Sequence, residues 1–272
     1  MRLREVAGLA VLAAMAASGC SRLAFVKTDP GRRGENRVSE PVVVHESAAA
    51  RQRSEGRNQL VIAQSRLLDG ELDTAEAAAQ RAAKLDPQSS DAYTLLAVIA
   101  ERRGRQAEAG AHYLRATELA PQDGGVANNY GAWLCANGRV AESLGWFQRA
   151  LADPTYRTPA AALANSGACA LRAGQAPKAD RELRAAVELD PENAVALGAL
   201  AQLQFQSGRY MEARAFSERR LAAAQADAAA LELASQIERK LGDTAAADRY
   251  VRRLREEFPG NVPGNPGDTT QR

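Results

Sequence analysis

The sequence predicts an all-α protein, a right-handed solenoid built from six helix-turn-helix repeats. The main observation is a ladder of six glycines separated by 34, 34, 36, 34 and 34 residues: Gly70, Gly104, Gly138, Gly174, Gly208 and Gly242. Small residues recur at fixed distances from these glycines, and proline recurs further along. The intervening segments are rich in alanine and poor in aromatic residues, so no part of the repeats requires a strand.

Two positions in each repeat hold only small residues, which indicates where its two helices cross. Antiparallel helices approach closely only where the side chains at the crossing are small. Five residues after each glycine stand Ala75, Ala109, Ser143, Ala179, Ala213 and Ala247. Seven residues before it stand Ala63, Ala97, Gly131, Gly167, Ala201 and Ser235. We therefore expect both positions to lie at the helix crossing of every repeat.

Proline marks the end of the second helix in four repeats, because it cannot continue a helix. It stands 17 residues after the glycine, as Pro87, Pro121, Pro191 and Pro259. With the 34-residue period, this pattern resembles the tetratricopeptide repeat (TPR) family, whose helical-hairpin fold it implies. The resemblance covers 56–261, with units at 56–89, 90–123, 124–157, 160–193, 194–227 and 228–261. Unit five carries Arg220 and Gln225 where the family has a late alanine and a proline, so we expect it to be the most irregular unit.

The N-terminal residues indicate a secretory signal. Arg2 and Arg4 precede an apolar run, Val6–Ala17, that is too short to span a bilayer core of about 30 Å. The following Ala17-Ser18-Gly19-Cys20 resembles the bacterial lipobox, which implies a signal peptide over 1–19 and a lipid on Cys20. The alternative is an ordinary cleavage site after Ala14-Met15-Ala16, which would leave an odd number of cysteines in an oxidising compartment.

Lipidation of this kind implies a Gram-negative bacterium and a chain that faces the periplasm. Ser21 follows the cysteine instead of an aspartate, which favours the outer membrane. Residues 20–55 show no repeat pattern and are expected to form a flexible tether, and 262–272 a disordered tail. The valine patch at 41–44 is either incidental or a docking segment.

The two other cysteines predict a disulfide between neighbouring repeats. Cys135 and Cys169 form an even pair in a compartment where disulfides persist. They are the twelfth residue of unit three and the tenth residue of unit four. Because their unit positions differ by two residues, one side chain is rotated about the helix axis by about 200° relative to the other. The two side chains then face each other across the stacked first helices. The alternative is a pair of small, buried thiols that stay reduced.

Residues that could support catalysis or metal binding are scarce. His45 and His112 have no second histidine or cysteine at metal-ligand spacing, and the sequence has no phosphate-binding loop or nucleophile motif. The net charge is +2 and the charged runs are mixed in sign, which argues against a nucleic-acid partner. We expect no catalytic residues, metal, cofactor or small-molecule substrate, and hence a protein that is not an enzyme.

A repeat array offers an extended concave surface lined by its first helices. We expect the lining at unit positions two, five, nine, twelve and thirteen. The predicted partner-binding residues in units two to four are Thr94, Val98, Glu101, Arg102, Asn128, Asn129, Ala132 and Asn165. Asparagine is common among TPR units at the position of Asn129 and Asn165, so a structural role is the alternative for these two.

A narrower resemblance lies in units three, four and six. The segments 127–135, 138–143, 163–167 and 249–260 are similar to the type IV pilus biogenesis and stability lipoproteins PilF and PilW, which also combine a lipobox with six TPR units. The resemblance implies type IV pilus biogenesis, twitching motility and a pilotin that promotes outer-membrane localisation or multimerisation of the secretin PilQ. A scaffold for cell-wall synthesis or outer-membrane protein assembly, and a regulatory subunit of an enzyme, stay open as alternatives.

Overall fold

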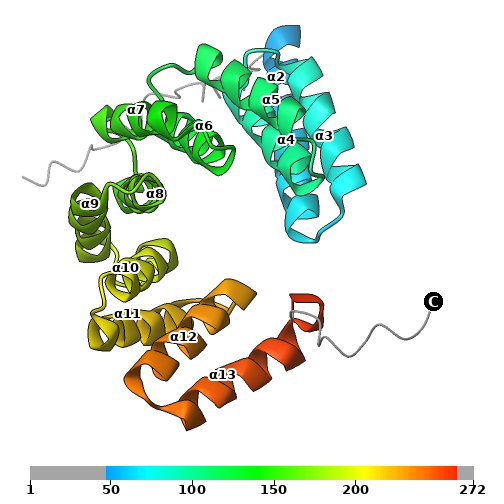
Figure 1. The fold of residues 1–272 in the computed structure, drawn as a ribbon. Helices are drawn as coiled ribbons and strands as arrows, with labels where there is room; N and C mark the ends of the chain where they lie inside the picture. The colour runs from blue at the N-terminus through cyan, green and yellow to red at the C-terminus, as the bar shows by residue number, and fades with distance from the viewer. Residues whose placement is uncertain (1–46, 262–272) are drawn as a thin grey trace, which may run out of the picture. The chain divides into compact units, whose positions relative to one another are not determined.

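The computed structural model describes residues 47–261, which form twelve α-helices, a final 3-10 turn and no strand (Figure 1). The helices come in six antiparallel pairs, joined within each pair by a short turn. The pairs are α2 (Ala48–Leu68) with α3 (Leu72–Leu85), α4 (Ser90–Arg102) with α5 (Gln106–Leu119), α6 (Gly124–Ala136) with α7 (Val140–Ala152), α8 (Pro159–Arg172) with α9 (Ala176–Leu189), α10 (Ala194–Gln206) with α11 (Tyr210–Ala223), and α12 (Ala228–Leu241) with α13 (Thr244–Glu257). The turn η2 (Pro259–Asn261) follows α13. The predicted all-α class is confirmed.

Successive pairs stack along an arc, so that each pair packs mainly on its neighbours. From α6 onward, Figure 1 shows the first helix of each pair on the inner side of the arc and the second helix on the outer side. First helices of adjacent pairs touch, as α8 does with both α6 and α10. This stacking gives the solenoid its continuous inner face.

The glycine ladder marks the turn inside each pair. All six ladder glycines have φ between 73° and 83°, whereas no other described residue has a positive φ. This left-handed conformation strains any residue that carries a Cβ atom. In the first turn, Gly70 N–H donates to the Leu67 carbonyl and Glu71 N–H donates to the Arg66 carbonyl at 2.9 Å, which satisfies the last carbonyls of α2.

The small residues on either side of the ladder form the helix crossings, as the sequence predicts. Ala75, Ala109, Ser143, Ala179 and Ala213 are all fully buried. At the glycine positions the helices are closer still. A Cβ atom on Gly131 would lie 2.9 Å from Phe147 Cε1, and one on Gly167 would lie 2.7 Å from Leu183 Cγ. Close packing at these crossings holds each pair together.

The long step of the ladder corresponds to a loop between α7 and α8 that is anchored on α6. Asp153 Oδ2 accepts a hydrogen bond from Gly124 N–H at 2.9 Å, and its Oδ1 accepts one from Thr155 N–H at 2.8 Å. These hydrogen bonds lower the pKa of Asp153 below its usual value, and the bond from Gly124 has the largest effect. Tyr156 packs on Gly124, where a Cβ atom would lie 2.8 Å from the Tyr156 ring. The two extra residues therefore form an ordered joint.

The first helix begins earlier than the sequence predicts. Residues 48–55 are helical, although they fall within the predicted flexible tether 20–55. Ser47 caps the helix by accepting a hydrogen bond from Ala50 N–H at 3.1 Å, and three alanines follow it. A good N-cap before strong helix formers extends α2 beyond the repeat. The rest of the predicted tether, its valine patch, the predicted signal peptide and the tail 262–272 lie outside the described residues.

Candidate functional site

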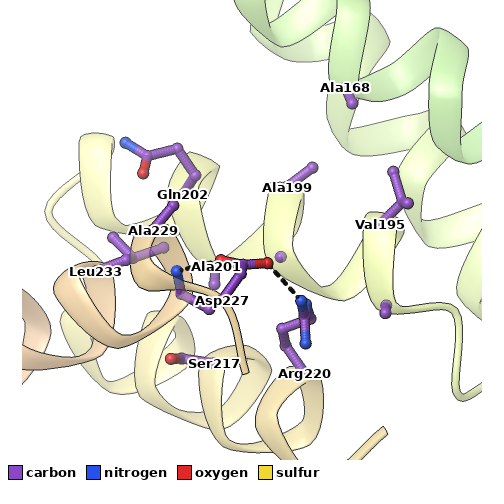
Figure 2. A pocket seen from close by; sticks show the side chains of 13 residues that line it. Ala168, Val195, Ala199, Ala201, Gln202, Ser217, Arg220, Asp227, Ala229 and Leu233 are labelled. Carbon is purple, nitrogen blue, oxygen red and sulfur yellow. Dashed lines mark hydrogen bonds and ion pairs between the residues drawn. The ribbon is translucent and has the colours of Figure 1, made fainter. Parts of the chain in front are cut away.

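A groove of about 400 Å³ lies on the first-helix face of units four to six (Figure 2). We call it the α10 groove, because α10 supplies six of its thirteen lining residues, more than any other helix. Its extent is marked by Ala168 on α8, by Val195, Gly198 and Gln202 on α10, by Arg220 on α11 and by Leu233 on α12. The groove therefore crosses the joint between units five and six.

The lining of the α10 groove is mostly apolar and made of small side chains. Nine of its thirteen residues are Ala, Gly, Val or Leu. Val195 is 50% exposed, so an approaching molecule can reach the apolar surface. The polar lining consists of Gln202, Ser217, Arg220 and Asp227, and Ser217 is buried.

The two charged residues of the groove form an ion pair with each other. Arg220 Nη2 donates to Asp227 Oδ2 at 2.7 Å, and Nη1 donates to the carbonyl oxygens of Ala224 and Gln225 at 3.4 and 3.2 Å. Asp227 Oδ1 accepts from Ala230 N–H at 2.8 Å and so caps α12. Figure 2 shows this ion pair as a dashed line between Arg220 and Asp227. The lining as a whole carries no net charge.

The position of Arg220 explains why the groove occurs in this part of the array. In units one to four the same unit position holds a buried alanine: Ala82, Ala116, Ala150 and Ala186. In unit five the long stem of Arg220 lies against Gly198 of α10. The loop that it binds also departs from the other units, because Ala224 at the end of α11 is fully extended, with φ −151° and ψ 161°. Helices α10 and α11 stay regular, so the irregularity predicted for unit five is confined to its last loop.

The predicted partner-binding residues of unit two lie apart from this groove. Glu101 accepts a hydrogen bond from the Tyr113 hydroxyl at 2.6 Å, and Arg102 donates to the Leu67 carbonyl of unit one at 2.8 Å. Burial, and then the bond to Glu101, raise the pKa of Tyr113 above its usual value. Thr94 and Val98 are half-buried, and Val98 packs against the core. Much of this surface is thus used within the array.

Two of the predicted residues in units three and four form a contact between these units. Asn165 Nδ2 donates to Asn128 Oδ1 at 3.0 Å, and Asn128 is only 8% exposed. Asn129 and Ala132 are half-buried on α6. The contact between Asn128 and Asn165 agrees with a structural role for Asn165, which the sequence leaves open.

The structure joins the predicted cysteine pair. Cys135 on α6 and Cys169 on α8 form a disulfide with their Cα atoms 6.0 Å apart. Both are buried beside Phe147, and Ser143 Oγ lies 3.0 Å from Cys169 Sγ. Ala168, the neighbour of Cys169, lines the α10 groove, so the disulfide fixes the helix that forms one wall.

Sequence reasoning missed the α10 groove, although the signal was present. Five lining residues of the groove lie at unit positions that are expected to line the inner face. Val195 and Ala229 are at position two, Gly198 is at position five, and Ala168 and Gln202 are at position nine. Of these five residues, all but Gln202 are small and apolar. The residues predicted from the sequence lie in units two to four, and none of them lines the groove.

Within residues 47–261, no group of histidine, cysteine and carboxylate side chains could hold a metal ion. No helix in this range is long and apolar enough to cross a membrane. Cys20, the predicted lipidation site, is not among the described residues.

Comparisons with known proteins agree with the repeat pattern. Two tetratricopeptide repeat models match residues 60–124 and 170–237. The type IV pilus assembly protein PilF of Pseudomonas aeruginosa is 23% identical over 193 residues, which cover 71% of this chain and 77% of PilF.

Two solved structures extend the agreement to the fold. The crystal structure of PilW, a widely conserved type IV pilus biogenesis factor, has 28% sequence identity and a TM-score of 0.67, and the match covers 75% of this chain and 94% of PilW. The structure of P. aeruginosa PilF has 22% identity and a TM-score of 0.66, with 77% and 94% covered. The chain is therefore a tetratricopeptide-repeat protein that is homologous to PilF and similar in structure to PilW and PilF.

Proposed function

We propose that this protein acts in type IV pilus biogenesis as an outer-membrane lipoprotein, a pilotin that brings a PilQ-type secretin to the outer membrane or promotes its multimerisation. The observation that carries the proposal is the similarity to PilF and PilW, which spans about three quarters of the chain and nearly the whole of both solved structures. TPR arrays bind other proteins through their inner face, which fits a role in assembly.

The proposed mechanism has three parts. A lipid on Cys20 keeps the protein at the membrane. The 27 residues from Cys20 to Glu46 separate this lipid from the array. The array binds secretin subunits, which raises their local concentration at the membrane where they assemble.

The first experiment tests the role in assembly. Deletion of the gene is expected to abolish twitching and the heat-stable secretin multimers of the outer membrane, and the intact gene supplied elsewhere restores both. Secretin multimers that persist at the outer membrane in the deletion strain rule out the pilotin role.

The second experiment tests the anchor. Cys20→Ser is expected to abolish labelling by a fatty-acid analogue and to release the protein from membranes. The matched control is Cys135→Ala together with Cys169→Ala, which removes the other two cysteines and leaves the labelling unchanged. Labelling that survives Cys20→Ser contradicts the proposed lipidation.

A further inference from the structure

Glycines inside the described helices fall into two groups, and among those that packing does not require, Gly56, Gly145 and Gly198, only Gly198 lines the α10 groove. Gly110, Gly124, Gly131 and Gly167 are required by packing, because a Cβ atom on any of them would lie within 3.0 Å of a neighbouring atom. Gly198 on α10 has no such reason: its nearest neighbour would be Arg220 Cδ, at 3.8 Å. Its φ is not positive either. Neither packing nor backbone conformation therefore requires glycine at this position.

A glycine that the fold does not require lowers the stability of its helix, because it loses more backbone entropy on folding than alanine does. What it provides is an exposed stretch of backbone that another molecule can approach closely. Gly198 lies in the α10 groove, at the unit position where unit two has Thr94 and unit three has Asn128. The absent side chain leaves space in the groove at this position.

The charges of the α10 groove restrict what can occupy it. Arg220 and Asp227 neutralise each other, and Arg220 also donates to two loop carbonyls. A charged group that entered the groove would lose its hydration without gaining an opposite charge. Apolar side chains would instead meet the alanines, Val195 and Leu233. The side-chain amide of Gln202 offers a donor and an acceptor to the backbone of the bound segment.

We propose that the α10 groove binds a short, uncharged, apolar segment of a partner protein, which comes against the backbone of α10 at Gly198. The proposal deepens the function proposed above by placing the recognition of the partner in units four to six. The proposal depends on the function proposed above only in that this function names the partner, a PilQ-type secretin. The bound segment presents small to medium apolar side chains and no charge at the point of contact.

The test uses a photo-crosslinking amino acid in the full-length protein in living cells. The probe replaces Val195 in the groove, and the control probe replaces Met211, which is a similarly exposed apolar residue of unit five outside the groove. We expect Val195 to crosslink to an uncharged apolar segment of a partner, identified by mass spectrometry, at a yield at least tenfold above that from Met211.

Two substitutions then link the crosslink to the groove. Gly198→Leu adds a bulky side chain to the lining of the groove and is expected to lower the crosslinking yield at least tenfold. Gly145→Leu is the matched control, because Gly145 is another helix glycine that packing does not require, with no described atom within 4 Å of an added Cβ atom, and it lies outside the groove. Gly198→Ala serves if the leucine variant does not fold, since its methyl group makes only ordinary contacts. It is expected to lower the yield about threefold while the melting temperature stays the same or rises.

The outcomes separate this proposal from the function on which it builds. A crosslink from Val195 to an apolar segment of a protein other than the secretin supports the groove and rejects the PilQ assignment. A secretin that crosslinks only through probes at Thr94 or Val98 supports the assignment and overturns the groove. The groove proposal is also overturned if Val195 crosslinks to a second copy of this chain or to a charged segment. Equal effects of Gly198→Leu and Gly145→Leu on the crosslinking yield overturn it as well.

Discussion

The joint between units three and four and the joint between units five and six stack the same kind of helical pair with different chemistry. The first is closed, with a disulfide, the contact between Asn165 and Asn128, and the ordered loop at Asp153. The second is held by ion pairs, and the α10 groove opens beside it. One array can therefore be rigid at one joint and accessible at another, because each joint depends mainly on its own two units.

The largest effect is expected from the closed joint. Replacing both Cys135 and Cys169 with alanine removes a cross-link between residues 34 apart, which is expected to cost about 4 kcal/mol of unfolding free energy. Urea unfolding of the variant and the parent measures the difference. Adding a reductant should destabilise only the parent, and a parent protein that is insensitive to reduction contradicts the role given to the bond.

The open joint is expected to depend on a buried ion pair. Glu238 is 4% exposed and accepts a hydrogen bond from Arg214 Nε at 2.9 Å. Arg214→Met leaves this carboxylate buried without its partner, which is expected to cost about 2 kcal/mol because water still reaches part of the site. The same urea assay measures it. The control is Arg219→Met, which replaces an exposed arginine of the same helix that has no carboxylate partner within residues 47–261, and it should change stability little.

A smaller effect on stability is expected from replacing glycines with alanine, and its sign should differ between Gly167, which packing requires, and Gly198, which lines the groove. Gly167→Ala forces a methyl group against Leu183 and is expected to destabilise the protein by about 1–3 kcal/mol. Gly198→Ala is expected to stabilise it by about 0.5–1 kcal/mol, because its site is open and alanine favours the helix. The melting temperatures of both variants show whether each substitution lowers or raises stability. Two shifts of the same sign would remove the distinction between the two kinds of glycine.

The smallest effect concerns the pH dependence of the closed joint. The pKa of Asp153 is lowered from its unfolded value of 3.8 by the hydrogen bonds from Gly124 and Thr155. Its contribution to stability is therefore fully present above about pH 5 and is lost as the pH falls through the lowered pKa. Asp153→Asn should flatten the dependence of the melting temperature on pH below 4.

The repeat pattern predicted the fold because it consists of local requirements. A left-handed turn needs glycine, and a close crossing needs a small residue, so the ladder and its flanking positions determine each pair. Arg220 was visible in the sequence as a departure, but its consequence was not. Whether a long side chain at a buried position fills space or opens a groove depends on the next helix, which the local pattern does not describe.

The predicted binding residues show the same limit. Unit positions give the direction in which a side chain points, but not what it meets. Glu101, Arg102 and Asn128 form hydrogen bonds with Tyr113, Leu67 and Asn165 of the array itself. The start of α2 could not be placed either, since a repeat pattern does not record a helix that continues beyond it.

The disulfide also has a consequence for the cooperativity of unfolding. A linear array of repeats usually frays from its ends, one pair after another, because each pair is held only by its neighbours. A covalent link between α6 and α8 merges the two middle pairs into one cooperative unit. Amide exchange should then show α6 to α9 opening together and last, with the outer pairs opening earlier.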